Sequence, residues 1–334
     1  MNRIFVSIAS YRDKLCSTTL INMYEMAKYP ENIYCGLCEQ NNIVIDESCI
    51  MPKKHPLYNL IIKNIRKVSI PHHQAKGPTY ARFICSTLHK NEEFFMQIDS
   101  HTLFIKNWDQ VLLDMFLNIE AEGHEKVIIS HYPPDFDDYL KELDMVTYIK
   151  DTRINKDGIP VFNGASFKKP TRHPEKNLYL SCNFFIARKA ILNDVPFDPY
   201  LPFLFEGEEI LYTIRAYTSG YNIFSPNRNI LFHHYIRQGE PKFWDDLDLL
   251  NRESILKVKY YLSYPIDLND IKSGAIKNSI PRYGLGNQRR LSDYWRETGI
   301  SVKTDGRKSE GPNLMLGVII LIIIIIILNL VIVA

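Results

Sequence analysis

Residues 93–101 read EFFMQIDSH, and this stretch decides the class of fold. The apolar part, 93–98, has the length and composition of a buried strand. Asp99, Ser100 and His101 follow at its carboxyl end, which is where ligands bind in open α/β sheets. In extended backbone, Asp99 and His101 project to the same side. They could therefore share a divalent ion such as Mn²⁺, which suits oxygen and imidazole ligands; the alternative is a capping Asp beside an unrelated His.

Strands and helices alternate around this stretch from the first residues to residue 133. Apolar runs predict strands over 4–10, 33–39, 67–70 and 126–130, and helical spacing predicts helices over 16–28, 79–89 and 108–121. Residues 41–57 are polar and predict a loop. Such alternation is typical of a parallel α/β sheet, so we predict this fold class.

The second half of the chain is less regular. We expect a strand and then a helix within 178–190, helices over 206–220 and 243–262, and two strands within 221–235. Residues 135–172 are polar and predict a loop or acceptor-facing insertion. Residues 263–313 predict a docking tail and linker.

Two other groups of side chains are candidates for chemistry. His233 and His234 follow an apolar strand, where neighbouring residues face opposite sides, so one of them could be a third metal ligand. His72 and His73 form a competing pair in a proline-flanked loop. Glu206, Glu208 and Glu209 begin a predicted helix. They either complement the helix dipole or bind sugar hydroxyls or the incoming nucleophile.

Composition excludes several classes of protein. The chain has 40 Lys and Arg against 38 Asp and Glu, a net charge of +2, and its basic residues are scattered, which disfavours nucleic-acid binding. The sequence lacks a GxGxxG between a strand and a helix, a P-loop and a GxSxG elbow. Dinucleotide dehydrogenases, P-loop enzymes and α/β-hydrolases are therefore disfavoured.

Six cysteines are present, and two of them form a CxxC at Cys35 and Cys38. This motif lies in a predicted strand, where residues three apart face opposite sides, which suits neither zinc nor redox chemistry. We predict reduced, structural thiols at these two positions. The N-terminal apolar run lacks the features of a signal peptide and predicts a first strand.

Residues 314–334 contain no charge and one polar side chain, Asn329. As a helix they would be about 31 Å long, the thickness of a bilayer core. We predict a C-terminal transmembrane anchor there and a linker over 296–313. Lys303, Arg307 and Lys308 precede the span, which favours a membrane-associated protein with its catalytic domain in the cytosol.

Several blocks together resemble a known family. They are IFVSIASYRD (4–13), GLCEQ (36–40), AKGPTYAR (75–82), QIDSHTLFIKNWD (97–109), PFDPYLPFLFEGEE (196–209), NILFHHYIR (229–237) and RYGLGNQRRLSDYW (282–295). The chain resembles cytoplasmic N-acetylglucosaminyltransferases that modify a hydroxyproline on a ubiquitin-ligase subunit, and more distantly mucin-type polypeptide N-acetylgalactosaminyltransferases. This implies a GT-A glycosyltransferase domain over 1–295, with a nucleotide-sugar and metal half (1–133) and an acceptor half (134–295).

The resemblance also implies roles for single residues. Asp99 and His101 would form a DxH motif that binds Mn²⁺, with His233 as the third ligand and His234 as the alternative. The residues that would lie against the nucleotide-sugar are Ser7, Ala9, Ser10, Tyr11, Arg12, Arg82, Asp99 and Ser100. Glu208 and Glu209 would bind the donor sugar or orient the acceptor.

The implied reaction is retaining transfer of a sugar from a UDP-sugar to a hydroxyl group, with GlcNAc as the favoured sugar. GalNAc, glucose and galactose stay open as the sugar, and a protein hydroxyproline, Ser or Thr or a glycan as the acceptor. Two other interpretations are an inactive GT-A domain that serves as a membrane-tethered sugar or protein binder, and a metal-dependent hydrolase.

Overall fold

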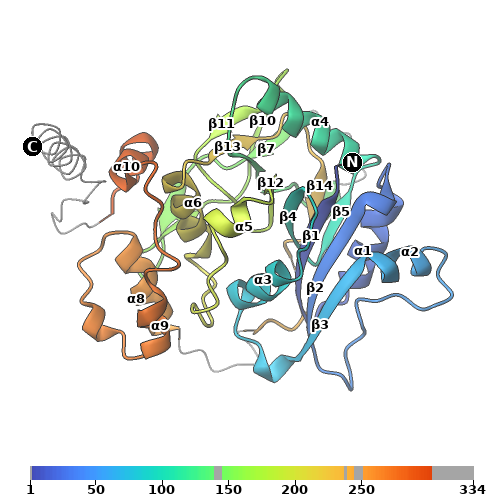
Figure 1. Ribbon diagram of the computed structural model, residues 1–334, viewed down its shortest axis with the longest axis horizontal. Helices are drawn as coiled ribbons and strands as arrows, with labels where there is room; N and C mark the ends of the chain where they lie inside the picture. Colours follow the sequence, from blue (N-terminus) through green and yellow to red (C-terminus); the bar gives the residue numbers. More distant parts are fainter. Residues whose placement is uncertain (1, 139–144, 237–238, 244–250, 303–334) are drawn as a thin grey trace, which may run out of the picture.

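The computed structural model describes residues 2–138, 145–236, 239–243 and 251–302. Its centre is an eight-stranded sheet with the order β11-β13-β6-β12-β4-β1-β2-β3 (Figure 1). These strands are β1 Ile4–Tyr11, β2 Ile33–Asn41, β3 Ile65–Pro71, β4 Phe94–Asp99, β6 Val127–Ser130, β11 Glu175–Asn177, β12 Phe184–Arg188 and β13 Asn222–Ser225. The strands predicted in the first half are therefore confirmed, with small shifts at their ends.

The predicted parallel pairing is confirmed for β1 with β2 and β4 and for β2 with β3. β12, for which no direction was predicted, lies antiparallel between β4 and β6 and pairs Phe184 with Ile98. Because β12 runs in the opposite direction, the residues that precede it lie at the carboxyl edge of β4. This register places Cys182 and Asn183 beside the Asp99 end of the sheet.

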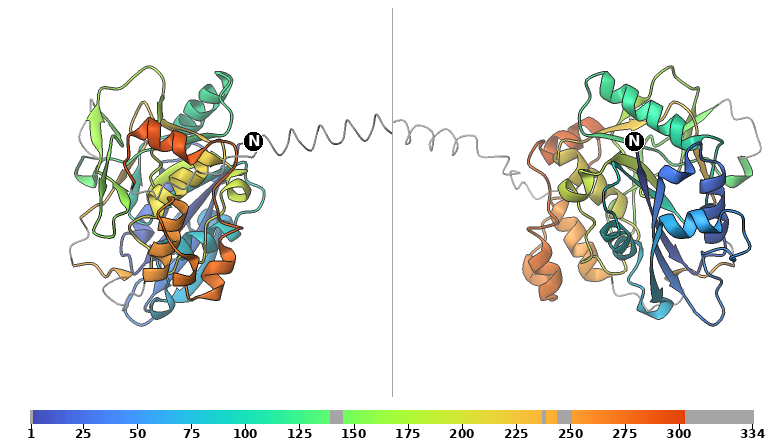
Figure 2. Two further views of the ribbon diagram at one scale, coloured as in Figure 1. Left: turned by 90° about the vertical axis from the view of Figure 1, so that its left-hand side faces the viewer. Right: turned by 45° about the vertical axis from the view of Figure 1, so that its right-hand side comes forward.

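Alternation along the strands gives the sheet two apolar faces. Ile4, Val6 and Ile8 pack into one core with α1 and α4, whereas Phe5 packs into another with side chains of α5 and α6 (Figure 1 and Figure 2). The helices of the first half are α1 Cys16–Glu25, α2 Tyr58–Asn64, α3 Pro78–Thr87 and α4 Trp108–Ala121. The predicted helices are confirmed, although α1 ends before residue 28, and α2 was not predicted.

The second half contains more regular structure than its sequence predicts. Its helices are α5 Ile191–Asp194, α6 Glu208–Thr218, α8 Arg252–Tyr261, α9 Gly274–Ser279 and α10 Leu291–Thr298. Within the predicted docking tail, α10 packs on α6 with the rings of Tyr217 and Tyr294 5.1 Å apart. Part of the predicted helix 243–262 lies outside the described residues.

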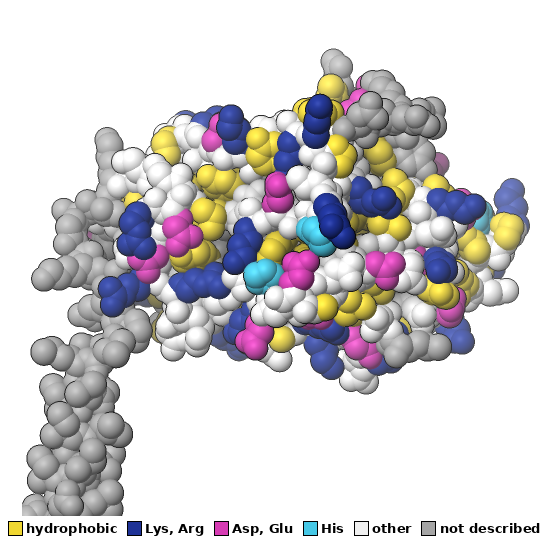
Figure 3. Space-filling view, turned by 90° about the horizontal axis from the view of Figure 1, so that it is seen from above, with side chains coloured by type: hydrophobic (Ala, Val, Ile, Leu, Met, Phe, Trp, Pro, Cys, Tyr) yellow, Lys and Arg dark blue, Asp and Glu magenta, His cyan; other side chains and the backbone are white. Residues whose placement is uncertain are grey.

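Short strands occupy the predicted loop 135–172 and the region around it. They are β7 Val146–Tyr148, β8 Thr152–Ile154, β9 Pro160–Phe162 and β10 Ser166–Lys168, while β5 Thr102–Phe104 pairs with β14 Leu231–His233. Over the face seen in Figure 3, Lys and Arg side chains are interspersed with Asp and Glu.

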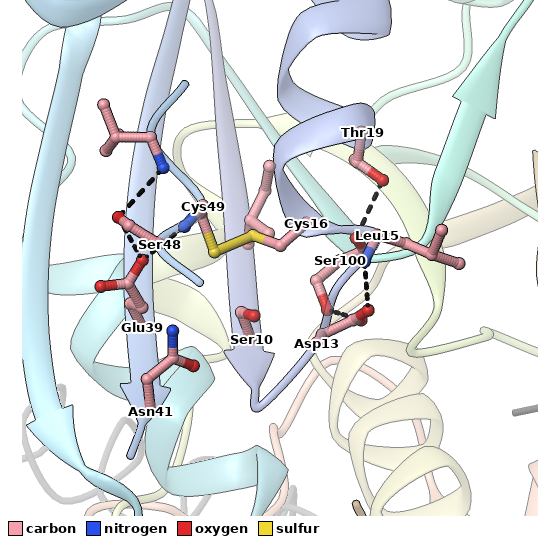
Figure 4. Close-up of a disulfide and its surroundings, with 12 residues drawn as sticks. Ser10, Asp13, Leu15, Cys16, Thr19, Glu39, Asn41, Ser48, Cys49 and Ser100 are labelled. Carbon is pink, nitrogen blue, oxygen red and sulfur yellow. Dashed lines mark hydrogen bonds between the residues drawn. A yellow bond between two sulfur atoms is a disulfide. The ribbon is translucent and has the colours of Figure 1, made fainter. Parts of the chain in front are cut away.

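A disulfide that the sequence analysis did not predict joins Cys16, at the start of α1, to Cys49 in the loop after β2 (Figure 4). Cys35 and Cys38 of the CxxC are buried, unpaired thiols, as predicted. The disulfide could not be predicted because Cys16 and Cys49 are 33 residues apart in the sequence, and only the packing of the loop against α1 brings them together.

Within the described residues, every helix is too short or too polar to cross a lipid bilayer. The predicted anchor at 314–334 lies outside the described residues. The division of the 1–295 domain at residue 133 stays a prediction, and the central sheet takes strands from both sides of it.

Candidate active site

Three predicted metal ligands meet at the carboxyl edge of the sheet. Asp99 ends β4, His101 follows two residues later, and His233 ends β14. The pairing of β14 with β5 sets His233 opposite Thr102, next to His101. One ligand atom from each of the three residues lies within 4.8 Å of the others. A carboxylate and two imidazoles at this spacing form a donor set that a divalent cation can bridge.

Asp13 holds His101 in position, a role that the sequence analysis missed. Its Oδ2 lies 2.7 Å from His101 Nδ1 and accepts a hydrogen bond of 2.6 Å from Ser100 Oγ. Leu15 N donates to the other carboxylate oxygen (Figure 4). A carboxylate at Nδ1 favours the proton on that nitrogen, so Nε2 is left as the electron-pair donor. Asp13 therefore prepares His101 to bind a cation through Nε2.

The structure distinguishes the two adjacent histidines. His233 is buried, and its Nε2 lies 3.2 Å from Asp99 Oδ2. Burial lowers the pKa of His233, and the nearby Asp99 opposes this effect only in part. The ring of His234 instead packs against Phe136, with centroids 5.3 Å apart. His233 thus joins Asp99 and His101, whereas His234 lines the same cavity without entering the group.

Arg82 links the metal-ligand group to the start of α6. It projects from α3, which begins after Gly77; the φ of +91° and the contact with Phe203 at this position favour glycine. Arg82 donates to Asp99 Oδ1 over 2.9 Å and to Glu208 through its other terminal nitrogen. Burial alone would raise the pKa of Asp99, but the His233 hydrogen bond and the Arg82 charge hold it well below its usual range.

Glu208 and Glu209 differ in their partners. Glu208 accepts hydrogen bonds from Arg82 and Thr79, and burial raises its pKa against the opposing effect of Arg82. Glu209 accepts a short hydrogen bond from Tyr132 and one of 2.9 Å from Cys182 N. Burial raises the pKa of Glu209 to about 7, although its hydrogen bonds act in the opposite direction. Glu208 therefore fixes Arg82, while Glu209 is the acid whose charge changes near neutral pH.

These side chains line one cavity of about 560 Å³, a size typical of small-molecule sites. The predicted site residues that line it are Ala9, Tyr11, Arg82, Asp99, Ser100, His101, Glu206, Glu208, Glu209, His233 and His234. Its apolar walls include Phe162 and Phe205, which suit a ring or a sugar face.

Ser7, Ser10 and Arg12 do not line this cavity, contrary to expectation. Ser7 is on the same side of β1 as Ala9, but it lies deeper in the sheet and donates to Gln97 over 2.8 Å. Arg12 follows the strand with a φ of +46°, and its Nε donates to Asp46 over 2.9 Å. The structure thus brings together most of the predicted site and leaves these three residues outside its cavity.

Tyr132, Cys182 and Asn183 also line the cavity and were not predicted. Tyr132 follows the end of β6, so the argument that identified Asp99 at a strand end could have found it. Cys182 and Asn183 precede β12, and only the antiparallel direction of that strand brings them to the same edge.

Comparison with known proteins identifies the family. The family described as glycosyltransferase (GlcNAc) matches residues 3–56 and 47–304, which is most of the chain. The chain belongs to this GlcNAc glycosyltransferase family. The resemblance predicted from the sequence blocks is therefore confirmed at family level. No curated protein matches the chain.

Solved structures share the fold of this glycosyltransferase. The crystal structure of GalNAc-T7 with UDP, GalNAc and Mn²⁺ has a TM-score of 0.55 and 12% identity; the match covers 90% of this chain and 55% of that one. S. aureus TarS 1–349 in complex with UDP-GlcNAc has a TM-score of 0.50 and 14% identity, with 79% and 68% covered. The chain thus spans about half the length of GalNAc-T7. At these identities the likeness shows the α/β GT-A-like fold alone.

Proposed function

We propose that this protein is a metal-dependent glycosyltransferase that moves GlcNAc from UDP-GlcNAc to a hydroxyl group. The observation that carries the proposal is the meeting of Asp99, His101 and His233 beside Arg82 in one cavity. The family match supports sugar transfer. The structures of GalNAc-T7 with UDP and Mn²⁺ and of TarS with UDP-GlcNAc support a nucleotide-sugar donor.

The residues present fit a divalent cation such as Mn²⁺. Asp99 is kept ionised by Arg82 and His233, and His101 is held by Asp13 with Nε2 left as a donor. When bound, such an ion would act as a Lewis acid and neutralise charge on the departing diphosphate. Asp99, His101 and His233 would hold it.

Arg82 and the two glutamates would act on the donor. Arg82 Nε is buried and has no hydrogen-bond partner among the described residues, so it could donate to a phosphate or ribose oxygen of the nucleotide. Glu208 would keep Arg82 in place, since it accepts from the same guanidinium. Glu209, with Tyr132 against its carboxyl group, would bind the donor sugar's hydroxyls or orient the acceptor.

We also propose retention of the anomeric configuration, as the family resemblance implies. In this reaction the acceptor hydroxyl would approach the face from which UDP leaves, and the departing phosphate would take its proton. The acceptor is a protein hydroxyproline, Ser or Thr, or a glycan.

We further propose attachment to a membrane through 314–334, because this segment has the length and composition of a span. The flanking basic residues favour a cytosolic catalytic domain, whereas the Cys16–Cys49 disulfide is typical of oxidising compartments. Protease protection of sealed vesicles that carry the full chain distinguishes the two orientations.

One assay separates this function from its rivals. The detergent-solubilised full chain is incubated with Mn²⁺ and a panel of UDP-sugars, with and without hydroxyproline and Ser/Thr peptides, and the released nucleotide is identified. Release of UDP that depends on Asp99 supports sugar transfer, and full activity of Asp99→Ala refutes the site. Nucleotide binding without turnover indicates an inactive binding domain, and release of a nucleoside monophosphate indicates a hydrolase.

A further inference from the structure

The turn that follows β2 exposes three consecutive aliphatic side chains. Ile43, Val44 and Ile45 are 88%, 85% and 67% exposed. Single exposed apolar residues are ordinary on protein surfaces, but a contiguous exposed group is typical of a contact site. All three are β-branched, so they lose little conformational freedom when they are covered.

Four backbone N–H groups of this turn are already hydrogen-bonded within it. Val44 N donates to Asn42 Oδ1 over 3.1 Å, and Ile45 N and Asp46 N donate to Asn42 O over 3.2 and 2.9 Å. At the base, Asn42 N donates to Asp46 over 2.7 Å. A backbone donor without a partner is costly to transfer into an apolar phase, so these bonds lower the cost of burying the tip. The turn is therefore held by its own hydrogen bonds and exposes apolar side chains at its tip.

The turn lies at the same edge of the sheet as the candidate active site. It follows Asn41 at the carboxyl end of β2, and Gln40 pairs with Tyr11, which lines the cavity. At its base, Asp46 accepts from Arg12, the residue after Tyr11. Figure 1 shows the ends of β2 and β3 on one side of the molecule and β10 on the other. A partner that covers the tip would therefore lie beside the mouth of the cavity.

The C-terminal part of the sequence indicates that a lipid bilayer is the apolar phase close to this turn. Residues 314–334 form an uncharged segment long enough to span a bilayer, and 303–313 join it to the last described residue, Val302. A fully extended connection of this length reaches roughly 36–40 Å, which allows the domain to rest on the membrane. We propose that Ile43, Val44 and Ile45 enter the lipid bilayer and turn the cavity towards its surface. This inference rests on the proposed membrane attachment.

The test places an environment-sensitive fluorophore at the tip of the turn. Val44→Cys in the full chain is labelled and reconstituted into phosphatidylcholine–phosphatidylserine vesicles with and without a lipid-borne quencher. Phe167→Cys is the matched control, since Phe167 is also an exposed apolar residue, at 50%, and it belongs to β10, which lies on the other side of the molecule. The four native free cysteines are buried, and unmodified chain treated in parallel measures their labelling.

We expect the probe at position 44 to show blue-shifted emission and quenching by the lipid-borne quencher, and the probe at 167 to show neither. Vesicle-bound chain with an unquenched probe at 44 would overturn the inference and leave the attachment intact. Failure of the full chain to float with vesicles would overturn both. A blue shift at 44 in detergent-free chain without vesicles would overturn the bilayer as the partner, because it indicates contact with a second copy.

Discussion

Asp13→Asn tests whether a buried carboxylate prepares the metal site. Asp13 is 6% exposed and accepts hydrogen bonds from Ser100 Oγ, Leu15 N and the Nδ1 side of His101, the last over 2.7 Å. Asparagine keeps the shape but loses the charge, and it can present an amide nitrogen to His101. The imidazole then loses its acceptor or adopts the other tautomer, in which Nε2 carries the proton and does not bind a cation.

The expected loss can be worked from these contacts. A hydrogen bond to a charged group contributes roughly 1.5–3 kcal/mol, and changes of this kind around a metal ligand typically cost 10–100-fold in metal affinity. The two figures agree, since 10–100-fold is about 1.4–2.7 kcal/mol. We therefore expect the Kd for Mn²⁺ to rise 10–100-fold, with full or partial recovery of UDP release at high Mn²⁺.

The assay is calorimetric titration of Mn²⁺ into wild type and variant, combined with thermal unfolding. Asp109→Asn is the matched control, because Asp109 is also buried, at 2% exposed, and accepts two backbone hydrogen bonds, from Lys28 and Tyr29. It should lose stability without losing metal affinity. An unchanged Kd in folded Asp13→Asn, or an equal loss in Asp109→Asn, would refute the reasoning.

Three other predictions follow from the same contacts. His233→Ala should abolish Mn²⁺-dependent UDP release, whereas His234→Ala should keep most of it, and equal losses would contradict the assignment of His233. The raised pKa of Glu209, about 7 against 4.5 in the unfolded chain, means that the folded protein binds more protons between these values, so stability falls as pH rises from 4.5 to 7. Chemical denaturation should show that the unfolding free energy of Glu209→Gln rises relative to that of wild type by up to roughly 3 kcal/mol from pH 4.5 to pH 7. A difference between the two proteins that does not change with pH would contradict the raised pKa. Reduction of the Cys16–Cys49 disulfide should lower the unfolding free energy by about 3–4 kcal/mol from the entropy of a loop of this length, measured with Cys16→Ser as the control that dithiothreitol leaves unchanged.

The sequence predicted the structure best where candidate ligand residues directly follow a clear strand pattern. A short apolar strand followed by Asp99 and His101 predicted both an element and a position at the edge of the sheet, and the structure places them there. It was least informative about β12, because an antiparallel strand inserted between parallel ones has the same local pattern as its neighbours. The contact of Glu209 with Cys182 depends on this insertion, so it could not be predicted either.

Asp13 shows a second limit. It stands after the first predicted strand and belongs to one of the blocks that carry the family resemblance, yet a single Asp in a loop has many ordinary roles. Its function depends on the contact of Oδ2 with His101, which is 88 residues away in the sequence. Contacts of this kind arise from tertiary packing, and sequence periodicity carries no information about them.

The charges of the site explain why several buried ionisable groups occur together. Asp99 and Glu208 contribute two negative charges and Arg82 one positive charge, while burial keeps His233 neutral. Among these three side chains the balance is one net negative charge, which lies beside the imidazoles of His101 and His233. Without Glu208, the guanidinium would cancel the charge of Asp99 and weaken attraction for a cation. Without Arg82, two carboxylates would face each other across a buried space, and one of them would take up a proton. Arg82 therefore keeps Asp99 ionised, and Glu208 offsets the charge of Arg82, which leaves a balance that favours a divalent cation followed by an anionic diphosphate.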